Sequence, residues 1–190
     1  MSENILLVSD TMIKERTAVH GNIDPKLIYP DIKLAQDMYI LPILGSALFN
    51  KLQTLVDDGS ISTNNADYKT LLDRYIVDAL IYYTLSELPS TISYQFWNKG
   101  VMRKQNDNSE LPSMTELMDL ANKYKNRAEF YANRLELYVK QNAAAKFPEY
   151  MRPGTGIDAV IPNNNQFSSP LYLGDDDYQC TRQPYQPYHE

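Results

Sequence analysis

A single unbroken helical pattern in the last half of the chain places the strongest constraint on the fold. Its start carries Ser113 and Glu116 at the spacing of a capping box, and no glycine or proline follows before Phe147 and Pro148. A helix of this length extends over about 50 Å at the usual rise per residue. Its apolar seam alternates steps of four and three, as in helices that lie along a partner helix, and consists of Leu117, Ala121, Tyr124, Ala128, Tyr131, Leu135 and Tyr138.

A second helical pattern, at residues 66–88, is the predicted core helix. Asn65 stands where a helix cap is expected, Pro89 is expected to stop the helix, and apolar side chains cover nearly its whole circumference. A helix of this kind must be surrounded by others. We expect the first half of the long helix to pack against it. The second half, which ends in the polar and small run VKQNAAAK, is expected to project toward a partner through Tyr131, Leu135 and Tyr138.

Shorter helices are predicted in the first third of the chain. Asp10 can cap a helix that continues to about Val19. Asp24 with Pro25 is a second start signal, but Pro30 is expected to interrupt the turn, so that the helix restarts there.

A tight corner is predicted where Pro42 and Gly45 follow one another in YILPILG, with Ser46 opening the next helix. Asp58 and Gly59 are expected to end that helix. The segment TISYQFWNKG, within residues 90–112, is ambiguous between a strand pair and a short helix, and a packed connector or small hairpin is favoured. These patterns together predict an all-α fold, a small helical bundle with one long C-terminal helix.

Residues 147–190 differ in composition from residues 1–146 and are predicted to form an extended, irregular C-terminal arm. They hold 6 of the 11 prolines, 3 of the 7 glycines and 5 of the 15 tyrosines, with few aliphatic side chains. Such a segment cannot build a core of its own. Because it is unusually aromatic, we expect it to lie on the surface of another polypeptide. The predicted organisation is therefore a helical domain at 1–146 followed by an arm at 147–190.

The arm carries the predicted partner-binding residues. Tyrosine rings bury a large area while the hydroxyl can still find a hydrogen-bond partner, which favours them as anchors. Arg182 could make a charge-assisted bond to a partner carboxylate, and an acidic triplet lies a few residues before it. The anchors and the triplet are Tyr172, Tyr178, Tyr185, Tyr188, Asp175, Asp176 and Asp177.

Charge is placed unevenly along the chain. The arm has six acidic and two basic residues, which accounts for −4 of the total charge of −6 and leaves residues 1–146 nearly balanced. We recognised no basic stripe, and the chain is therefore a poor candidate for gripping DNA phosphates. The only local basic group, Lys99, Arg103 and Lys104, is interpreted as a solvated loop, with contact to an acidic partner as the alternative.

Signals for catalysis, metal binding or a cofactor are weak. The two histidines, His20 and His189, have no metal-ligand pattern nearby, and Cys180 is the single cysteine. Asp175 to Asp177 lack the alternating acids and the downstream glutamate of a calcium loop. Nucleotide-binding glycine loops and the nucleophile elbow are also missing from the sequence. We therefore expect no enzyme activity, no cofactor and no metal. An unfamiliar helical hydrolase is a minor alternative that predicts a polar pocket containing His20.

The chain has no run of 18 apolar residues, and its start lacks a basic leader with a small-residue cleavage site. These observations predict a soluble, cytosolic protein with no membrane association.

Two segments resemble head-tail connector proteins of tailed bacteriophages, in particular those of the crAss-like group. They are DIKLAQDMYILPILGSALFNKLQ, with its proline corner and leucine helix, and the tyrosine-rich LLDRYIVDALIYYTLSELP. The resemblance covers roughly residues 1–146 and rests on pattern rather than on an invariant signature. It implies a structural virion protein of the neck or tail that is assembled in the host cytoplasm.

The same resemblance implies the partners. These are further copies of the chain in a dodecameric ring, the portal protein, an adjacent neck or tail ring protein, and DNA that passes without sequence-specific contacts. An acidic channel lining would let DNA slide. The competing interpretation is a monomeric intracellular binding or regulatory module whose tail is a disordered peptide ligand.

Overall fold

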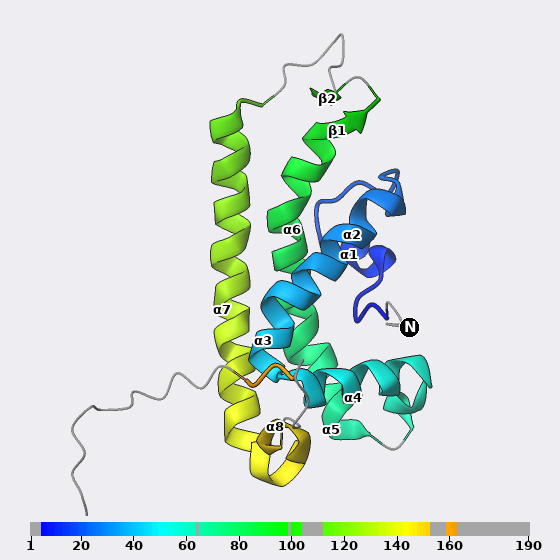
Figure 1. Ribbon diagram of the computed structural model, residues 1–190, viewed down its shortest axis with the longest axis vertical. Coiled ribbons are helices and arrows are strands. Elements are labelled where there is room, and N and C mark those ends of the chain that lie inside the picture. Colours follow the sequence, from blue (N-terminus) through cyan, green and yellow to red (C-terminus); the bar gives the residue numbers. More distant parts are fainter. Residues whose placement is uncertain (1–4, 64, 99, 104–111, 153–158, 163–190) are drawn as a thin grey trace, which may run out of the picture.

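The computed structural model describes residues 5–63, 65–98, 100–103, 112–152 and 159–162. It confirms the all-α class, with a short two-stranded hairpin as the only sheet in this part of the chain. Two long helical rods stand side by side, and the helices of the first third pack across one of them (Figure 1). The helices are α1 (Asp10–Arg16), α2 (Pro25–Ala35), α3 (Leu41–Leu44), α4 (Ser46–Asp57), α5 (Ala66–Leu71), α6 (Val77–Ser93), α7 (Met114–Lys146) and α8 (Pro148–Met151).

The remaining elements are short. Two π-helical turns, η1 (Gln36–Ile40) and η3 (Leu72–Ile76), join α2 to α3 and α5 to α6, and η2 (Ser60–Ser62) is a 3-10 turn. Strands β1 (Tyr94–Trp97) and β2 (Gly100–Arg103) pair antiparallel, with Tyr94 opposite Arg103. The small hairpin favoured by the sequence is therefore confirmed.

The two prolines that were expected to end helices lie inside them, and this expectation was wrong. Pro30 is in the middle of α2, and Pro89 is followed by one more turn of α6. A proline removes only one backbone hydrogen bond from the helix. Ile28 and Ile32 are fully buried around Pro30, and Leu85 and Leu88 are buried just before Pro89. Burial on the same helix face therefore outweighs the lost bond.

Caps and corners follow the sequence more closely. Ser113 and Glu116 form the predicted capping box of α7. Gly45 has a φ of 76°, in the region that favours glycine, and ends α3 at the predicted corner. Asn65 stands at the cap position of α5 but makes no capping bond, because its side-chain amide donates to the carbonyl of Ser60 (3.2 Å).

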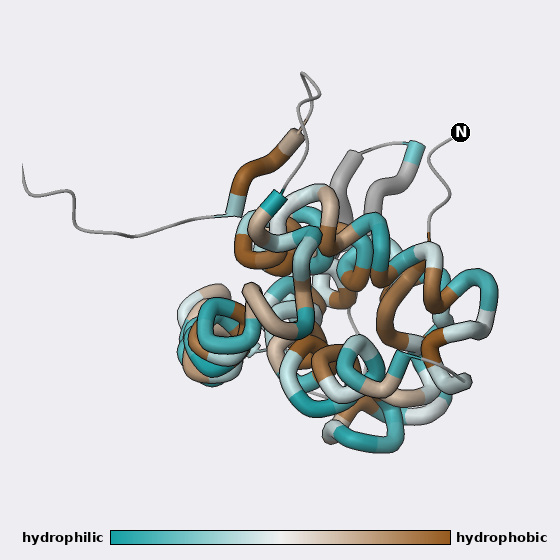
Figure 2. Tube along the Cα trace, turned by 90° about the horizontal axis from the view of Figure 1, so that it is seen from below, coloured by the Kyte–Doolittle hydropathy of each residue, from teal (hydrophilic) through white to brown (hydrophobic). Residues whose placement is uncertain are grey.

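The core lies where α2, α6 and α7 meet. Figure 2 looks down the axis of α7, which lies at one edge of the bundle. Tyrosines stack between α7 and the rod formed by α5, η3 and α6. The ring centroids of Tyr75 and Tyr138 are 3.9 Å apart, and those of Tyr82 and Tyr131 are 5.4 Å apart. These stacked pairs join the two long rods.

The N-terminal strap is held to the core by glutamine side chains. Gln36 is fully buried, and its amide accepts from the Leu7 backbone N–H and donates to the Ile5 carbonyl, both at 3.0 Å. Gln53 donates to the same carbonyl at 3.2 Å. Both polar ends of Gln36 are therefore satisfied, as a buried amide requires.

The first part of the predicted arm belongs to the helical domain, so the predicted boundary at 146/147 was wrong. Phe147 is fully buried, and its ring meets Tyr68 edge-on at 5.5 Å. α8 follows directly, and the Tyr68 hydroxyl donates to Glu149 at 2.7 Å. An isolated aromatic residue between a helix and a proline gave no sign in the sequence that it would be buried.

A second piece of the arm, residues 159–162, packs at the corner between α3 and α4. The Ser46 backbone N–H donates to the Val160 carbonyl (2.9 Å), and the Val160 N–H donates to the Ser46 hydroxyl (2.8 Å). Pro162 lies so close that a Cβ on Gly45 would come within 2.7 Å of its ring. Gly45 is therefore required both for the turn and for this close approach.

Candidate protein-interaction surface

The two halves of α7 are covered very differently by the rest of the chain. Every buried residue of α7 lies in its second half, from Ala128 onward, where η3, α3, α5 and α8 contact it. Before Ala128 the helix exposes large apolar side chains: Met114 is 54% exposed, Met118 is 56% exposed and Leu120 is 39% exposed. The first half of α7, residues 114–127, is therefore an incompletely covered apolar surface.

This arrangement reverses the expectation for the long helix. The sequence predicted that the second half would project, yet Val139 is fully buried and Ala143 nearly so. α8 folds back along this end of the helix, and Phe147 closes the space beside Tyr138, with the two rings 6.1 Å apart. Small alanines allow this close approach, and they do not mark a projecting end.

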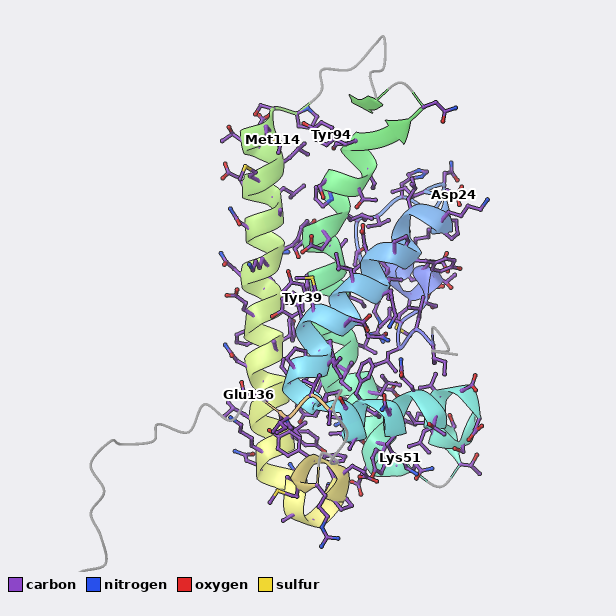
Figure 3. The ribbon with its side chains drawn as sticks, viewed as in Figure 1. Asp24, Tyr39, Lys51, Tyr94, Met114 and Glu136 are labelled. Atoms are coloured by element: carbon purple, nitrogen blue, oxygen red, sulfur yellow. The ribbon has the colours of Figure 1, made fainter. Side chains whose placement is uncertain are left out.

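One groove lies between the first half of α7 and the α6 rod on the side of η1. It has a volume of about 250 Å³ and is lined by Tyr39, Tyr94, Met114 and Met118, with Glu87 and Lys125 also contributing. Figure 3 shows Tyr94 and Met114 together at one end of the rods and Tyr39 farther along them. The Tyr94 hydroxyl lies 3.6 Å from the Met114 sulfur. The groove thus combines tyrosine and methionine side chains with charged and other polar ones.

Tyr39 is the most strongly constrained side chain of this groove. Its ring stacks on Tyr83 at 4.0 Å, and its hydroxyl donates to Glu87 at 2.9 Å. Burial, followed by the hydrogen bond to Glu87, raises the pKa of Tyr39 to about 12. The phenol therefore stays protonated at neutral pH, and it acts as a hydrogen-bond donor rather than as a base.

A second groove lies on the other flank of the same half of α7, where the loop after α1 approaches it. Its volume is about 380 Å³, and most of its lining is apolar, including Val19, Ile23, Leu88 and Leu120. His20 is at its edge, and its Nδ1 accepts the backbone N–H of Asn22 at 3.1 Å. This mostly apolar lining differs from the polar pocket around His20 that the minor hydrolase alternative requires.

A buried carboxyl links α2 to α6 near the first groove. Asp31 is 5% exposed, one of its oxygens accepts the Thr91 hydroxyl at 2.9 Å, and the other has no hydrogen-bond partner. Burial raises the pKa of Asp31, the Thr91 hydrogen bond opposes this shift, and the nearby charge of Glu87 adds to it. The hydrogen bond between Asp31 and Thr91 therefore joins α2 to α6.

One flank of α7, about 100° around the helix from the seam, carries a basic and apolar strip that the sequence analysis missed. Lys123, Arg127, Phe130, Arg134 and Leu137 follow one another at steps of four and three, and all are exposed. Phe130 is 66% exposed and Leu137 is 60% exposed. We call these five residues the outer strip. The same spacing rule that revealed the seam, started at Lys123, would have found it.

Two arginines of the outer strip rest on tyrosine rings. The Arg127 guanidinium lies 5.8 Å from the centre of the Tyr124 ring, and that of Arg134 lies 4.9 Å from the centre of the Tyr75 ring. Stacking of this kind orients a guanidinium while leaving its N–H groups available to acceptors. The expectation that the chain has no basic stripe is therefore corrected.

The predicted partner-binding residues fall into two groups. Leu135 is fully buried inside the chain, and Tyr131 and Tyr138 stack on tyrosines of the neighbouring rod, so packing within the chain accounts for all three. The others lie outside the described residues: Tyr172, Asp175, Asp176, Asp177, Tyr178, Arg182, Tyr185 and Tyr188. Lys99 and Lys104 also lie outside them, and Arg103 is described only by its backbone in β2.

Neither a metal-binding cluster nor a membrane-spanning helix occurs in the described ranges. Within them, no three histidine, cysteine, aspartate or glutamate side chains come together as a metal-binding group. No helix in the same part of the chain is both long enough and apolar enough to span a lipid bilayer.

The fold and this surface define an all-α bundle protein whose longest helix is only half covered. The chain belongs to DUF6712, a family of unknown function, whose family model matches residues 40–160. The matched region runs from the end of η1 to Val160 and so includes Phe147, α8 and part of the segment that packs at Gly45. No curated protein and no solved structure matches the chain.

Proposed function

We propose that this protein is a structural virion component, a head-tail connector that forms an oligomeric ring at the junction of portal and tail through which DNA passes. The observation that carries the proposal is the incomplete cover of the first half of α7. Met114, Met118 and Leu120 are between 39% and 56% exposed, and no residue of α7 before Ala128 is buried. Exposed apolar patches of this kind commonly mark a protein interface.

A ring built from identical subunits requires two different faces on each subunit, because its contacts are head-to-tail. The chain offers two surfaces with different chemistry. One is the first half of α7 with its two flanking grooves, which is apolar and rich in methionine and tyrosine. The other is the outer strip, which is basic with two large apolar side chains. This difference supports a heterologous contact over a self-complementary one.

The position of the ring in a virion and its partners come from the resemblance to phage connectors. The proposed partners are further copies of the chain in a dodecameric ring, the portal protein and an adjacent neck or tail ring protein. DNA passes through the ring without sequence-specific contacts. In this proposal the protein is assembled in the host cytoplasm, resides in the neck or tail of the virion and has no membrane partner.

Light scattering coupled to size-exclusion chromatography tests the proposal, on the full chain alone and mixed with the portal protein of the same genome. The matched variants are Met118→Glu, within the uncovered half of α7, and Met151→Glu, on α8, because both side chains are similarly exposed. We expect rings or portal complexes with the wild type and with Met151→Glu, and loss of both with Met118→Glu. A wild-type protein that stays monomeric and does not bind the portal protein would contradict the proposal and favour the monomeric binding or regulatory module.

A truncation sharpens the same experiment. The chain is cut after Pro162. A cut before Phe147 would remove Phe147 and Tyr150, which are buried in the helical domain. Removal of residues 163–190 is expected to weaken assembly while the helical content of residues 5–162 is retained. Circular dichroism of the truncated protein checks that the domain remains folded.

A further inference from the structure

The outer strip is a site for which the chain itself provides a complementary segment. We propose that the outer strip of α7 binds residues 163–190 of a neighbouring copy, through the acidic triplet and the tyrosines of that segment. This inference rests on the ring proposed above and names the contact that joins one subunit to the next.

Charge is the first argument. From Lys123 to Lys146, α7 carries six basic and two acidic residues, although the whole chain has a net charge of −6. Lys140 is paired with Glu136 at 2.6 Å and Lys146 with Asp67 at 2.9 Å. Among the residues that the structure describes, no ion pair is made by Lys123, Arg127 or Arg134. Residues 163–190 carry four acidic residues and one basic residue, and thus have the opposite charge.

The apolar members of the strip select the class of ligand. Phe130 and Leu137 lie one heptad apart between the basic side chains, and each is at least 60% exposed. Nucleic acid phosphates would leave these two side chains in water, whereas tyrosine rings would cover them. Pairing of two outer strips would bring arginine against arginine, which is repulsive. An acidic peptide with aromatic residues matches both parts of the strip.

The arginine geometry favours carboxylates. With each guanidinium plane resting near a tyrosine ring, at 5.8 Å for Arg127 and 4.9 Å for Arg134, the N–H edges remain available to an acceptor. Carboxylates accept such donors in paired hydrogen bonds. Asp175, Asp176 and Asp177 offer three carboxylates in succession.

The available length of chain permits the contact. Pro162 is held against Gly45 at the corner between α3 and α4, and 28 residues follow it in the sequence. An extended segment of this length spans up to about 90 Å, compared with about 50 Å for the whole of α7. The segment is therefore long enough to leave its own subunit and lie along the helix of the next one.

Thiol cross-linking of the full chain tests the contact, because Cys180 is the only cysteine and lies within the proposed ligand. One population carries Asn133→Cys, next to the strip on α7, together with Cys180→Ser. The other population is wild type. The two are mixed and treated with a short bismaleimide that bridges two nearby thiols. The matched control replaces Asn133→Cys with Asn50→Cys, at an exposed asparagine on α4.

We expect cross-linked dimers with the thiol at position 133 and few with the thiol at position 50. Reversal of charge in Arg127→Glu with Arg134→Glu should lower the cross-linked fraction about tenfold or more, since two charge-assisted contacts are lost. Replacement of Asp175, Asp176 and Asp177 by lysine in the wild-type partner should restore it. Recovery by this second reversal is not expected from a merely unfolded variant.

Each other outcome overturns the inference in a distinguishable way. Rings that form without the cross-link to position 133 would reject the docking contact and leave the proposed function standing. Protein that is monomeric and gives no cross-link would reject both. In a third population, which carries Asn133→Cys and retains Cys180, cross-links confined within single chains would show that the segment folds back on its own subunit. Binding of a short labelled DNA duplex that is lost with the arginine reversal would assign the strip to phosphate.

Discussion

The two halves of α7 share one helix and one seam, yet they differ in what surrounds them. After Ala128 the seam is closed by η3, α3, α5 and α8, and Leu135 and Val139 are fully buried. Before Ala128, α6 runs along the helix, and a groove opens on either flank. A regular apolar seam therefore shows that a helix packs, but it does not tell which part is covered by the same chain.

The difference has a structural cause. The α7 helix has 33 residues, whereas most elements packed beside it have fewer than 18. In the described part of the chain, α8 and Phe147 pack at the second half of α7, whereas Tyr94 of the hairpin and the loop after α1 border the first half beside α6. Residues that would be core in a complete bundle therefore remain partly exposed, and this is where assembly is proposed.

The sharpest contrast between a covered and an uncovered position along α7 should come from two phenylalanines, one at its end and one on its flank. Phe147→Ala removes a fully buried ring and should lower the free energy of unfolding by about 3–5 kcal/mol. Phe130→Ala removes a ring that is 66% exposed and should change it by less than about 0.5 kcal/mol in the dilute protein. Urea unfolding followed by circular dichroism measures both. Equal losses would mean that the flank of α7 at Phe130 is covered after all.

Two alanines at equivalent seam positions give the next largest effect. Ala128→Leu overpacks a fully buried site and should destabilise the fold by about 1–3 kcal/mol. Ala121→Leu, one heptad earlier, places its side chain at a groove of about 250 Å³ and should be tolerated. Thermal unfolding of the two variants compares them. A strong loss with Ala121→Leu alone would contradict the difference described here.

The cap of α7 should have a smaller, local effect. Ser113→Ala removes the hydroxyl that accepts the Glu116 N–H at 3.2 Å and should cost about 1 kcal/mol. Because the first half has few tertiary contacts, amide exchange should accelerate in its first turns and stay slow around Leu135. Thr115→Ala serves as the control. Faster exchange throughout α7 would mean that the helix behaves as one cooperative unit.

Acidification should reveal the smallest effect, at the same cap. Hydrogen bonds from the Ser113 backbone N–H and then from its hydroxyl lower the pKa of Glu116 below its ordinary value of 4.5. A lowered pKa means that the capping contribution is present above pH 4.5 and is lost as the pH falls through the lowered pKa. Carbon chemical shifts of residues 113–118 follow the fraying. In the Glu116→Gln variant these chemical shifts should depend less on pH. The same pH dependence as in the wild type would exclude Glu116 as the cause of the fraying.

Local signals in the sequence predicted much of the backbone. The capping box at Ser113, the corner at Gly45 and the core helix beginning at Ala66 all depend on neighbouring residues, and the structure confirms them. Pro30 and Pro89 were misinterpreted because burial of their helices offsets one missing hydrogen bond. Packing between distant segments decides such positions, and a single sequence does not display it.

The interaction surface was harder to predict for the same reason. The helix periodicity correctly identified Leu135 as a residue that packs against other side chains. We assigned it to a contact with a partner because α8 and Phe147, which pack at this end of α7, had been placed in the arm. The outer strip was missed because its charges were judged along the sequence, where acidic residues such as Glu129 lie between them. The phage connector assignment, the partners and the arm anchors stay predictions.

Hydrogen-deuterium exchange of the wild-type chain, compared between dilute monomer and concentrated or portal-bound protein, tests most directly whether another subunit covers the first half of α7. We expect slower exchange in residues 114–127 on assembly and a smaller change in residues 128–146, whose seam the chain itself already protects. Unchanged exchange in residues 114–127 of an assembled ring would contradict the assignment of this surface.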